Sequence, residues 1–232
     1  MTMLVSSQSP MALIAAPEVL AIPIVENHDP LIDIKHSDEL FIGPSPEIAN
    51  NTDYTKMRND VYQRLLAAQQ LLPANLRFCL YEGFRSLSLQ KKLFDARYAE
   101  LQQLYPHWTL EELFNETTKL ISPVLNLDGS PNIPPHTTGA AIDVYLVDKE
   151  GQLVDMGIHP RDWMSDTHVE LSPTNSTRVS SEAAHHRRVM SHALLLAGFV
   201  NYPTEYWHWS YGDRYWAFIS GKPQACYGSI AG

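Results

Sequence analysis

The pattern of apolar positions divides the chain into helical and extended segments. Between Asp53 and Pro73, apolar side chains recur at roughly helical spacing, at Met57, Val61, Leu65, Leu66 and Leu72. This spacing predicts a helix that ends before Pro73. Residues 76–81 then form a compact run of β-prone residues, which Glu82 and Gly83 end. We expect a buried strand there.

Three further helices have recognisable ends. Ser86 or Ser88 can cap a helix that continues to Tyr98, and Thr109 with Glu112 forms a capping-box pattern. A long helix begins at Ser180 or Ser181 and ends at Gly198. The segments between these helices, 122–135 and 157–177, are polar and irregular, which is typical of loops.

The strands form a second set of elements. Residues 141–147 alternate, so that Ile142 and Val144 face one side and Asp143 the other. Residues 148–151 predict a hairpin turn, with a returning strand at 152–156. Residues 199–202 and 206–211 predict strands on either side of Pro203, and 215–219 one more short element. Helices and hairpins in separate blocks predict an α+β fold, with a small antiparallel sheet flanked by helices.

The first 35 residues differ from the rest of the chain. Residues 1–35 mix Ser, Pro and apolar residues without periodicity, and we expect an extended N-terminal arm. Residues 36–232 have the length of one domain. The apolar run before Pro17 is short, and no Lys or Arg precedes Lys35, which disfavours a secretory signal and a membrane span. A cytoplasmic protein is expected, with the periplasm as the alternative.

Composition excludes some classes of protein. A hydrophobic fraction of 44% and a charged fraction of 19% are ordinary for a globular chain. The net charge of −9, from 17 Lys and Arg against 26 Asp and Glu, disfavours nucleic-acid and anionic-membrane partners. Cys79 and Cys226 lack the spacing of a zinc knuckle, so buried free thiols are expected.

Two short segments carry the candidate chemistry. His136 and Asp143 flank Gly139, which allows a bend that returns the imidazole toward the carboxylate. Glu205 and His208 lie in an aromatic setting further along the chain. Two His with one carboxylate are a common catalytic zinc set, and the second carboxylate can serve as a base. The alternatives are a solvated strand residue for Asp143 and a surface imidazole for His208.

The position of Glu205 is constrained by strand geometry. In a regular strand, residues i and i+3 point to opposite faces, so Glu205 must lie in the bend after Pro203 to share a site with His208. Arg85 lies at a strand-to-helix junction, which suits either a site residue or a solvated side chain. The other histidines lie on a helix without a His-Glu-x-x-His pattern or stand alone in loops.

These residues give the chain a specific resemblance. Residues 85–208 resemble the zinc D-alanyl-D-alanine dipeptidases, the VanX-type branch of the D,D-peptidase and Hedgehog-related metallopeptidases. The family's Ser-x-His-x-x-Gly-x-Ala-x-Asp is met by residues 134–143, its Glu-x-Trp-His by 205–208, and its Gly-Tyr-Arg by 83–85. The similarity extends over about residues 40–218. One departure is Pro134, which replaces the family Ser.

The resemblance implies a set of roles. His136, Asp143 and His208 would bind one Zn²⁺ per chain, with Glu205 as the catalytic base and Arg85 stabilising the oxyanion. The expected reaction is hydrolysis of a D,D-dipeptide, most readily D-Ala-D-Ala, although Pro134 puts the strictness of that preference in question. The alternatives are a zinc D,D-carboxypeptidase or endopeptidase acting on peptidoglycan stem peptides, and a zinc-bearing binding domain without catalysis. The oligomeric state is not indicated.

Overall fold

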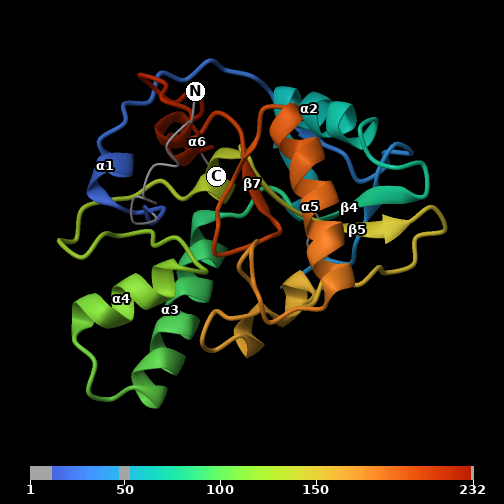
Figure 1. Cartoon of the computed structure of the whole chain (residues 1–232). Coiled ribbons are helices and arrows are strands. Elements are labelled where there is room, and N and C mark those ends of the chain that lie inside the picture. Colours follow the sequence, from blue (N-terminus) through green and yellow to red (C-terminus); the bar gives the residue numbers. More distant parts are fainter. Residues whose placement is uncertain (1–11, 47–52, 231–232) are drawn as a thin grey trace, which may run out of the picture.

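A mixed five-stranded sheet forms the centre of the computed structural model, which describes residues 12–46 and 53–230 (Figure 1). The strands lie in the order β2-β4-β5-β7-β6. Their bounds are β2 (Phe41–Ile42), β4 (Leu76–Glu82), β5 (Ala141–Asp148), β6 (Val200–Asn201) and β7 (His208–Ser210). The pairings are antiparallel except for β2 with β4. The α+β class predicted from the sequence is confirmed.

Helices surround this sheet. Four longer ones are α2 (Asn59–Gln69), α3 (Leu87–Leu104), α4 (Leu110–Thr118) and α5 (Ser181–Leu196). The shorter ones are α1 (Pro17–Leu20) and α6 (Arg214–Ile219), with 3₁₀ turns η1 (Asp53–Thr55), η2 (Pro135–Thr138) and η3 (Pro160–Ser165). The predicted caps are confirmed: Ser86, Thr109 and Ser180 each accept an amide hydrogen bond from the first turn of their helix, and Thr109 with Glu112 completes a capping box.

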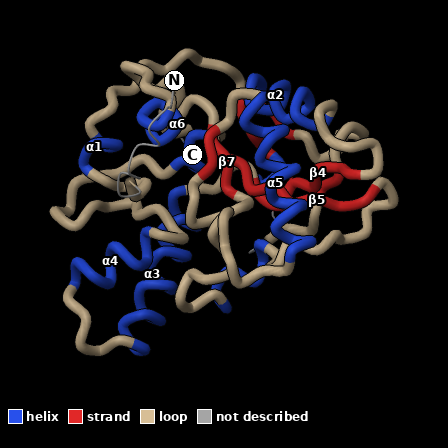
Figure 2. Tube along the Cα trace, in the orientation of Figure 1, coloured by secondary structure: helices blue, strands red, loops and turns tan. Residues whose placement is uncertain are grey.

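The hydrophobic core lies between the sheet and α2 with α5. These two helices contact each other, α5 also contacts β5, and α5 crosses the sheet in Figure 2. Met57, Val61, Leu65, Met190 and Leu194 are fully buried there, as are Ile142 and Val144 of β5. Residues 141–147 are buried throughout. Both faces of β5 are therefore covered, one by the core and the other by the site described below.

The N-terminal segment follows the surface of this domain. After α1, Ile24 forms a parallel bridge with Ala225. The strand β1 (Leu31–Asp33) then pairs with β3 (Lys56–Arg58) in a separate two-stranded sheet. Ile14 and Val19 are buried with Val200 and Tyr215. Residues 12–33 thus pack on elements that lie much later in the chain.

The structure corrects two predicted elements. The segment expected to be helical from Asp53 begins with η1 and β3, and the helix starts only at Asn59. Met57 belongs to β3, where pairing with β1 outweighs the helical spacing of its side chain. The turn after β5 forms, with the Gly151 amide donating to the Asp148 carbonyl at 3.0 Å, but the expected returning strand 152–156 is reduced to one bridge between Val147 and Leu153.

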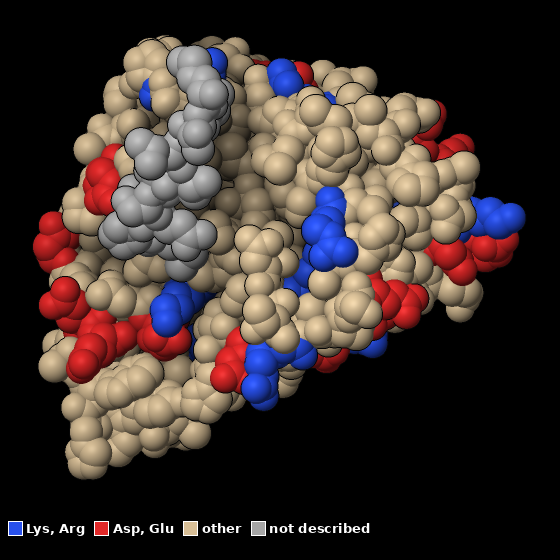
Figure 3. All heavy atoms as spheres, viewed as in Figure 1, with Lys and Arg blue, Asp and Glu red and all other residues tan. Residues whose placement is uncertain are grey.

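The surface is acidic in places, in keeping with the net charge. Acidic side chains gather at the left of the face in Figure 3, over α1 and α4, where Glu18, Glu111 and Glu112 are exposed. Within the part of the chain that the structure describes, no helix is both long and apolar enough to cross a membrane. Cys79 and Cys226 are free thiols, and burial raises the pKa of Cys79 to about 11.

Candidate metal centre

The register of the sheet places three polar side chains in one row. In β5, Asp143 pairs with Glu82 of β4 on one side and with His208 of β7 on the other. Residues directly opposite each other in a sheet project from the same face. A β-bulge between Leu80 and Glu82 shifts the register of β4, so that Glu82 rather than Tyr81 lies opposite Asp143. The three side chains are buried on the face away from α2 and α5.

A tight turn adds His136 to this row. His136 lies in η2, and Gly139 ends that turn with a φ of +71°, a left-handed conformation that glycine adopts without strain. A Cβ at Gly139 would also lie 2.6 Å from the Leu31 side chain. The chain therefore reverses into β5, as the position of Gly139 predicted. The Gly83 carbonyl accepts a hydrogen bond from His136 Nδ1 at 2.7 Å, which turns Nε2 toward Asp143.

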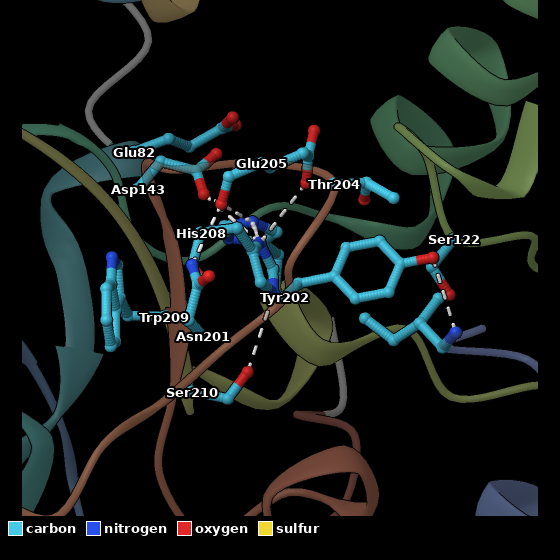
Figure 4. A network of polar contacts seen from close by, with 12 residues as sticks. Glu82, Ser122, Asp143, Asn201, Tyr202, Thr204, Glu205, His208, Trp209 and Ser210 are labelled. Carbon is cyan, nitrogen blue, oxygen red and sulfur yellow. Dashed lines mark hydrogen bonds and ion pairs between the residues drawn. The ribbon is translucent and has the colours of Figure 1, made fainter. Parts of the chain in front are cut away.

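The three predicted ligands converge. His136 Nε2 lies 3.1 Å from His208 Nδ1 and 3.4 Å from Asp143 Oδ1, and His208 Nδ1 lies 3.1 Å from the same oxygen. One ligand atom from each residue lies within 4.8 Å of the others. Figure 4 shows the carboxylates of Asp143 and Glu205 pointing toward the His208 ring. Side chains separated by up to 72 positions thus meet at one point.

The electrostatics of this group fit a cation. Burial alone would raise the pKa of Asp143, but the adjacent His136 and His208 hold the pKa well below its usual range, so the carboxylate is ionised. Burial lowers the pKa of His208, which favours the neutral imidazole that a metal requires. The carbonyl bond to His136 Nδ1 fixes the tautomer that leaves a lone pair on Nε2. Two imidazoles and one carboxylate are a common donor set for a divalent cation.

Glu205 lies in the bend after Pro203, as strand geometry required. Its amide donates to the Tyr202 carbonyl at 2.9 Å, and the Asn201 side chain donates to its carbonyl at 2.9 Å. Its Oε2 lies 3.9 Å from His208 Nδ1. Burial and then the nearby Asp143 charge raise the pKa of Glu205 well above its ordinary value. Two carboxylates in one pocket thus have pKa values displaced in opposite directions, a pattern common at acid–base sites.

Arg85 is held in a fixed orientation beside the same group. Glu82 accepts from its Nε at 3.0 Å and from its Nη2 at 2.5 Å, and Gln90 accepts from its Nη1 at 3.0 Å. Nη2 also lies 4.0 Å from Asp143 Oδ2. Sequence reasoning missed Glu82 and Gln90, although Gln90 lies one helical turn after the N-cap of α3. Glu82 and Gln90 hold the planar guanidinium of Arg85 in one orientation.

All five predicted site residues line one small cavity. Its volume is about 30 Å³, and its wall includes His136, Asp143, His208, Glu205 and Arg85. Further wall residues that the sequence did not indicate come from five different parts of the chain, and they include Ile14, Tyr81, Ser122, Trp163 and Tyr202. These residues lack a local signal, because only the tertiary fold brings them to the cavity.

Comparisons of sequence and structure identify proteins to which the chain is similar. A sequence profile of the D-ala-D-ala dipeptidase family, Peptidase_M15, matches residues 52–222. A D-alanyl-D-alanine dipeptidase of Synechocystis sp. is 28% identical over 221 residues, covering 86% of this chain and 88% of that protein. Among solved structures, the LD-carboxypeptidase LdcB is a distant match, with a TM-score of 0.38 and 13% identity over 85% of this chain and 76% of the other.

Proposed function

The chain belongs to the D-ala-D-ala dipeptidase family of metallopeptidases, and we propose that it hydrolyses a D,D-dipeptide, most readily D-Ala-D-Ala. The observation that carries the proposal is the convergence of His136, Asp143 and His208 beside a second carboxylate with a raised pKa. That combination offers a cation site and a base within one cavity. A binding domain without catalysis would have no use for either Glu205 or the fixed Arg85.

We propose Zn²⁺ as the cation, one per chain. His136 Nε2, His208 Nδ1 and one oxygen of Asp143 would hold it, because these atoms face one another, the pKa of Asp143 is lowered and the pKa of His208 is lowered. When bound, the ion lowers the pKa of a water molecule from about 15.7 to about 7. Three protein ligands leave a coordination position open for that water, which is the arrangement of a catalytic rather than a structural site.

The remaining chemistry belongs to the side chains of the protein. Glu205 takes the proton from the attacking water and passes it to the departing amine. The raised pKa of Glu205 makes its carboxylate a stronger base for the first transfer. The Arg85 guanidinium stabilises the negative charge that develops on the peptide oxygen, and Glu82 keeps it in place.

The second candidate function is cleavage of peptidoglycan stem peptides by the same chemistry. A long stem peptide needs an open cleft, whereas the wall residues here enclose about 30 Å³. This size favours the dipeptide. Pro134, which replaces the Ser of the family pattern, is buried at the start of η2. The dipeptide side chains that the site prefers should therefore be measured. The cytoplasmic location remains a prediction.

The test compares two substrates across three metal states. D-Ala release is measured from D-Ala-D-Ala and from a pentapeptide stem, with zinc-loaded, EDTA-treated and zinc-restored protein. We expect rapid release from the dipeptide only, its loss with EDTA and its recovery with zinc. His136→Ala should bind less than one equivalent of zinc and stay inactive after zinc addition. Release from the stem peptide alone would favour the carboxypeptidase, and release from neither would favour a binding domain.

A further inference from the structure

One wall of the metal cavity comes from the extreme N-terminal part of the described chain. Ile14 lines the cavity together with the five site residues, and only 6% of its surface is exposed. Its amide lies 3.4 Å from the Tyr202 hydroxyl, a contact that spans 188 positions in the chain. Tyr202 also lines the cavity, and its ring lies edge-on to His208 at 6.0 Å. Figure 4 shows Tyr202 extending from His208 toward Ser122.

The N-terminal segment is hydrogen-bonded to the domain mainly through residues that follow α1 in the chain. The Val25 and Asn27 amides donate to the carbonyls of Ala225 and Cys226, at 2.9 and 3.0 Å. The Arg214 side chain donates to the Ile22 carbonyl at 3.0 Å. Ile14, by contrast, meets the Tyr202 hydroxyl at the long limit of a hydrogen bond and otherwise packs through apolar contacts. Among the described residues of this segment, residues 12–16 therefore have fewer hydrogen bonds to the rest of the domain than residues 22–27 have.

The size of the cavity makes a movement of its wall necessary. About 30 Å³ is enough for about two water molecules and far less than a dipeptide fills. Among the other wall residues, Tyr81, Asp143 and His208 belong to β4, β5 and β7, which are held by sheet pairing. The Ile14 segment has no strand partner at residues 12–16, within the part of the chain that the structure describes.

We propose that residues 12–16 form a movable wall of the active site, and that Ile14 limits the length of the peptide that the site accepts. The inference rests on the proposed function, and it names the feature of this chain that would make the enzyme a dipeptidase rather than a peptidase of longer peptides. With Ile14 present, the wall opens only far enough to admit two residues. With a smaller side chain, the cavity extends past Tyr202 toward the surface, and a third residue can be accommodated.

The test uses three full-length variants. Ile14→Gly removes the wall side chain, and Ile14→Leu restores a side chain of equal size. Val19→Ala is the matched control, because Val19 packs in the same apolar cluster but does not line the cavity. Each protein is assayed with D-Ala-D-Ala and with two tripeptides that extend it by one residue, at the amino or the carboxyl end. We expect Ile14→Gly to raise kcat/KM for at least one tripeptide by tenfold or more, on the order of what one pocket contact contributes to discrimination.

A second measurement is independent of turnover. The rate at which a bulky chelator removes zinc is recorded for the same proteins, with thermal unfolding to verify that each is folded. Zinc should leave Ile14→Gly faster than wild type, Ile14→Leu or Val19→Ala. Unchanged tripeptide rates and unchanged zinc release in folded Ile14→Gly overturn the inference, even if the wild type hydrolyses the dipeptide. If the wild type hydrolyses no peptide, the proposed function fails, and the zinc-release rates alone decide whether Ile14 covers the site.

Discussion

Two buried clusters of charged groups lie on either side of the loop around Tyr206 and Trp207. They differ in how their charges are partnered. The first is the metal cavity. The second, which we term the loop anchor, consists of Arg187 and Asp166, and it holds the irregular segment between β5 and α5. Both are buried, yet only the first gathers side chains that repel one another.

In the loop anchor, each charge is matched by fixed backbone groups. Arg187 donates to the Met156 carbonyl at 2.9 and 2.5 Å and to the Pro173 carbonyl at 2.7 Å, and its guanidinium lies 4.1 Å from the centre of the Tyr206 ring. Asp166 accepts from three successive amides, those of residues 170–172, at 2.8, 2.9 and 2.6 Å. A buried charge with such partners contributes to stability.

In the metal cavity, the side chains face one another instead. Asp143 and Glu205 bring two carboxylates into one pocket, where each ionised group raises the proton affinity of the other. His136 and His208 place two ring nitrogens 3.1 Å apart. The charges of the loop anchor thus all have partners within the protein. The cavity instead gathers carboxylates and imidazole lone pairs that a bound cation would pair with. Mutations should therefore affect stability in one cluster and chemistry in the other.

The largest effect is expected from Glu205→Gln in the metal cavity. Loss of the base should lower kcat by about 10²–10⁴-fold on D-Ala-D-Ala, with zinc content unchanged. The folded-state pKa of Glu205 is raised, so its ionisation destabilises the fold once the pH exceeds the unfolded pKa. Metal-depleted Glu205→Gln should therefore be more stable than metal-depleted wild type at pH 7, and the difference should vanish below about pH 4. Steady-state kinetics and denaturant unfolding measure the two effects.

Two results would contradict this part of the comparison. Normal turnover in Glu205→Gln would remove Glu205 from the role of base. A lower unfolding midpoint for the metal-depleted variant at pH 7 would mean that Glu205 is a stabilising group, like those of the loop anchor.

A smaller effect, on stability rather than chemistry, is expected from Arg187→Met in the loop anchor. The substitution leaves the Met156 carbonyl buried without its donor, at a cost of about 1–3 kcal/mol, whereas the Pro173 carbonyl keeps the Ser176 amide at 2.9 Å. Zinc binding per folded molecule should be retained. Arg188→Met is the matched control, because Arg188 is the next residue on α5 and is exposed. The control should change the unfolding free energy by less than about 0.5 kcal/mol. Equal stability of the two variants would mean that the anchor contributes nothing.

The two clusters also differ in how far the sequence predicted them. The three converging residues of the cavity lie in short motifs, and the bend at Gly139 followed from its position before an alternating strand. Arg187 carries no local signal, since it is one of two adjacent arginines on a helix, and only the tertiary fold decides which is buried. Ile14 was part of a segment expected to be an arm, because a contact across 188 positions leaves no periodicity in the sequence.

The same limit explains the errors in the predicted elements. Met57 lies four residues before Val61, which is helical spacing, yet Met57 belongs to a strand whose partner, β1, lies more than 20 residues earlier. Local spacing cannot distinguish a buried strand residue from a buried helix residue when the element is only three residues long. Strong local signals, such as the capping box at Thr109, were by contrast confirmed.

The smallest effect on stability is expected from Asp166→Asn. Its dependence on pH distinguishes the loop anchor from the metal cavity. Burial alone would raise the pKa of Asp166, but its hydrogen bonds, first those from Ser172, hold it below the ordinary value of 3.8. The ionised carboxylate therefore stabilises the fold above the unfolded pKa, and this contribution is lost as the pH falls through the lower folded pKa. We expect Asp166→Asn to cost about 1–3 kcal/mol at pH 7 and progressively less below pH 4.

Guanidinium unfolding at a series of pH values measures this cost, and Asp162→Asn is the matched control because Asp162 is an exposed aspartate of the same segment. The sign distinguishes the two clusters: a neutral side chain at position 166 destabilises the protein at pH 7, whereas one at position 205 stabilises the metal-depleted protein. If Asp166→Asn cost the same at pH 3 and at pH 7, its effect would come from lost packing or hydrogen-bond geometry instead of from charge. The loop anchor would then no longer be an electrostatic counterpart to the metal cavity.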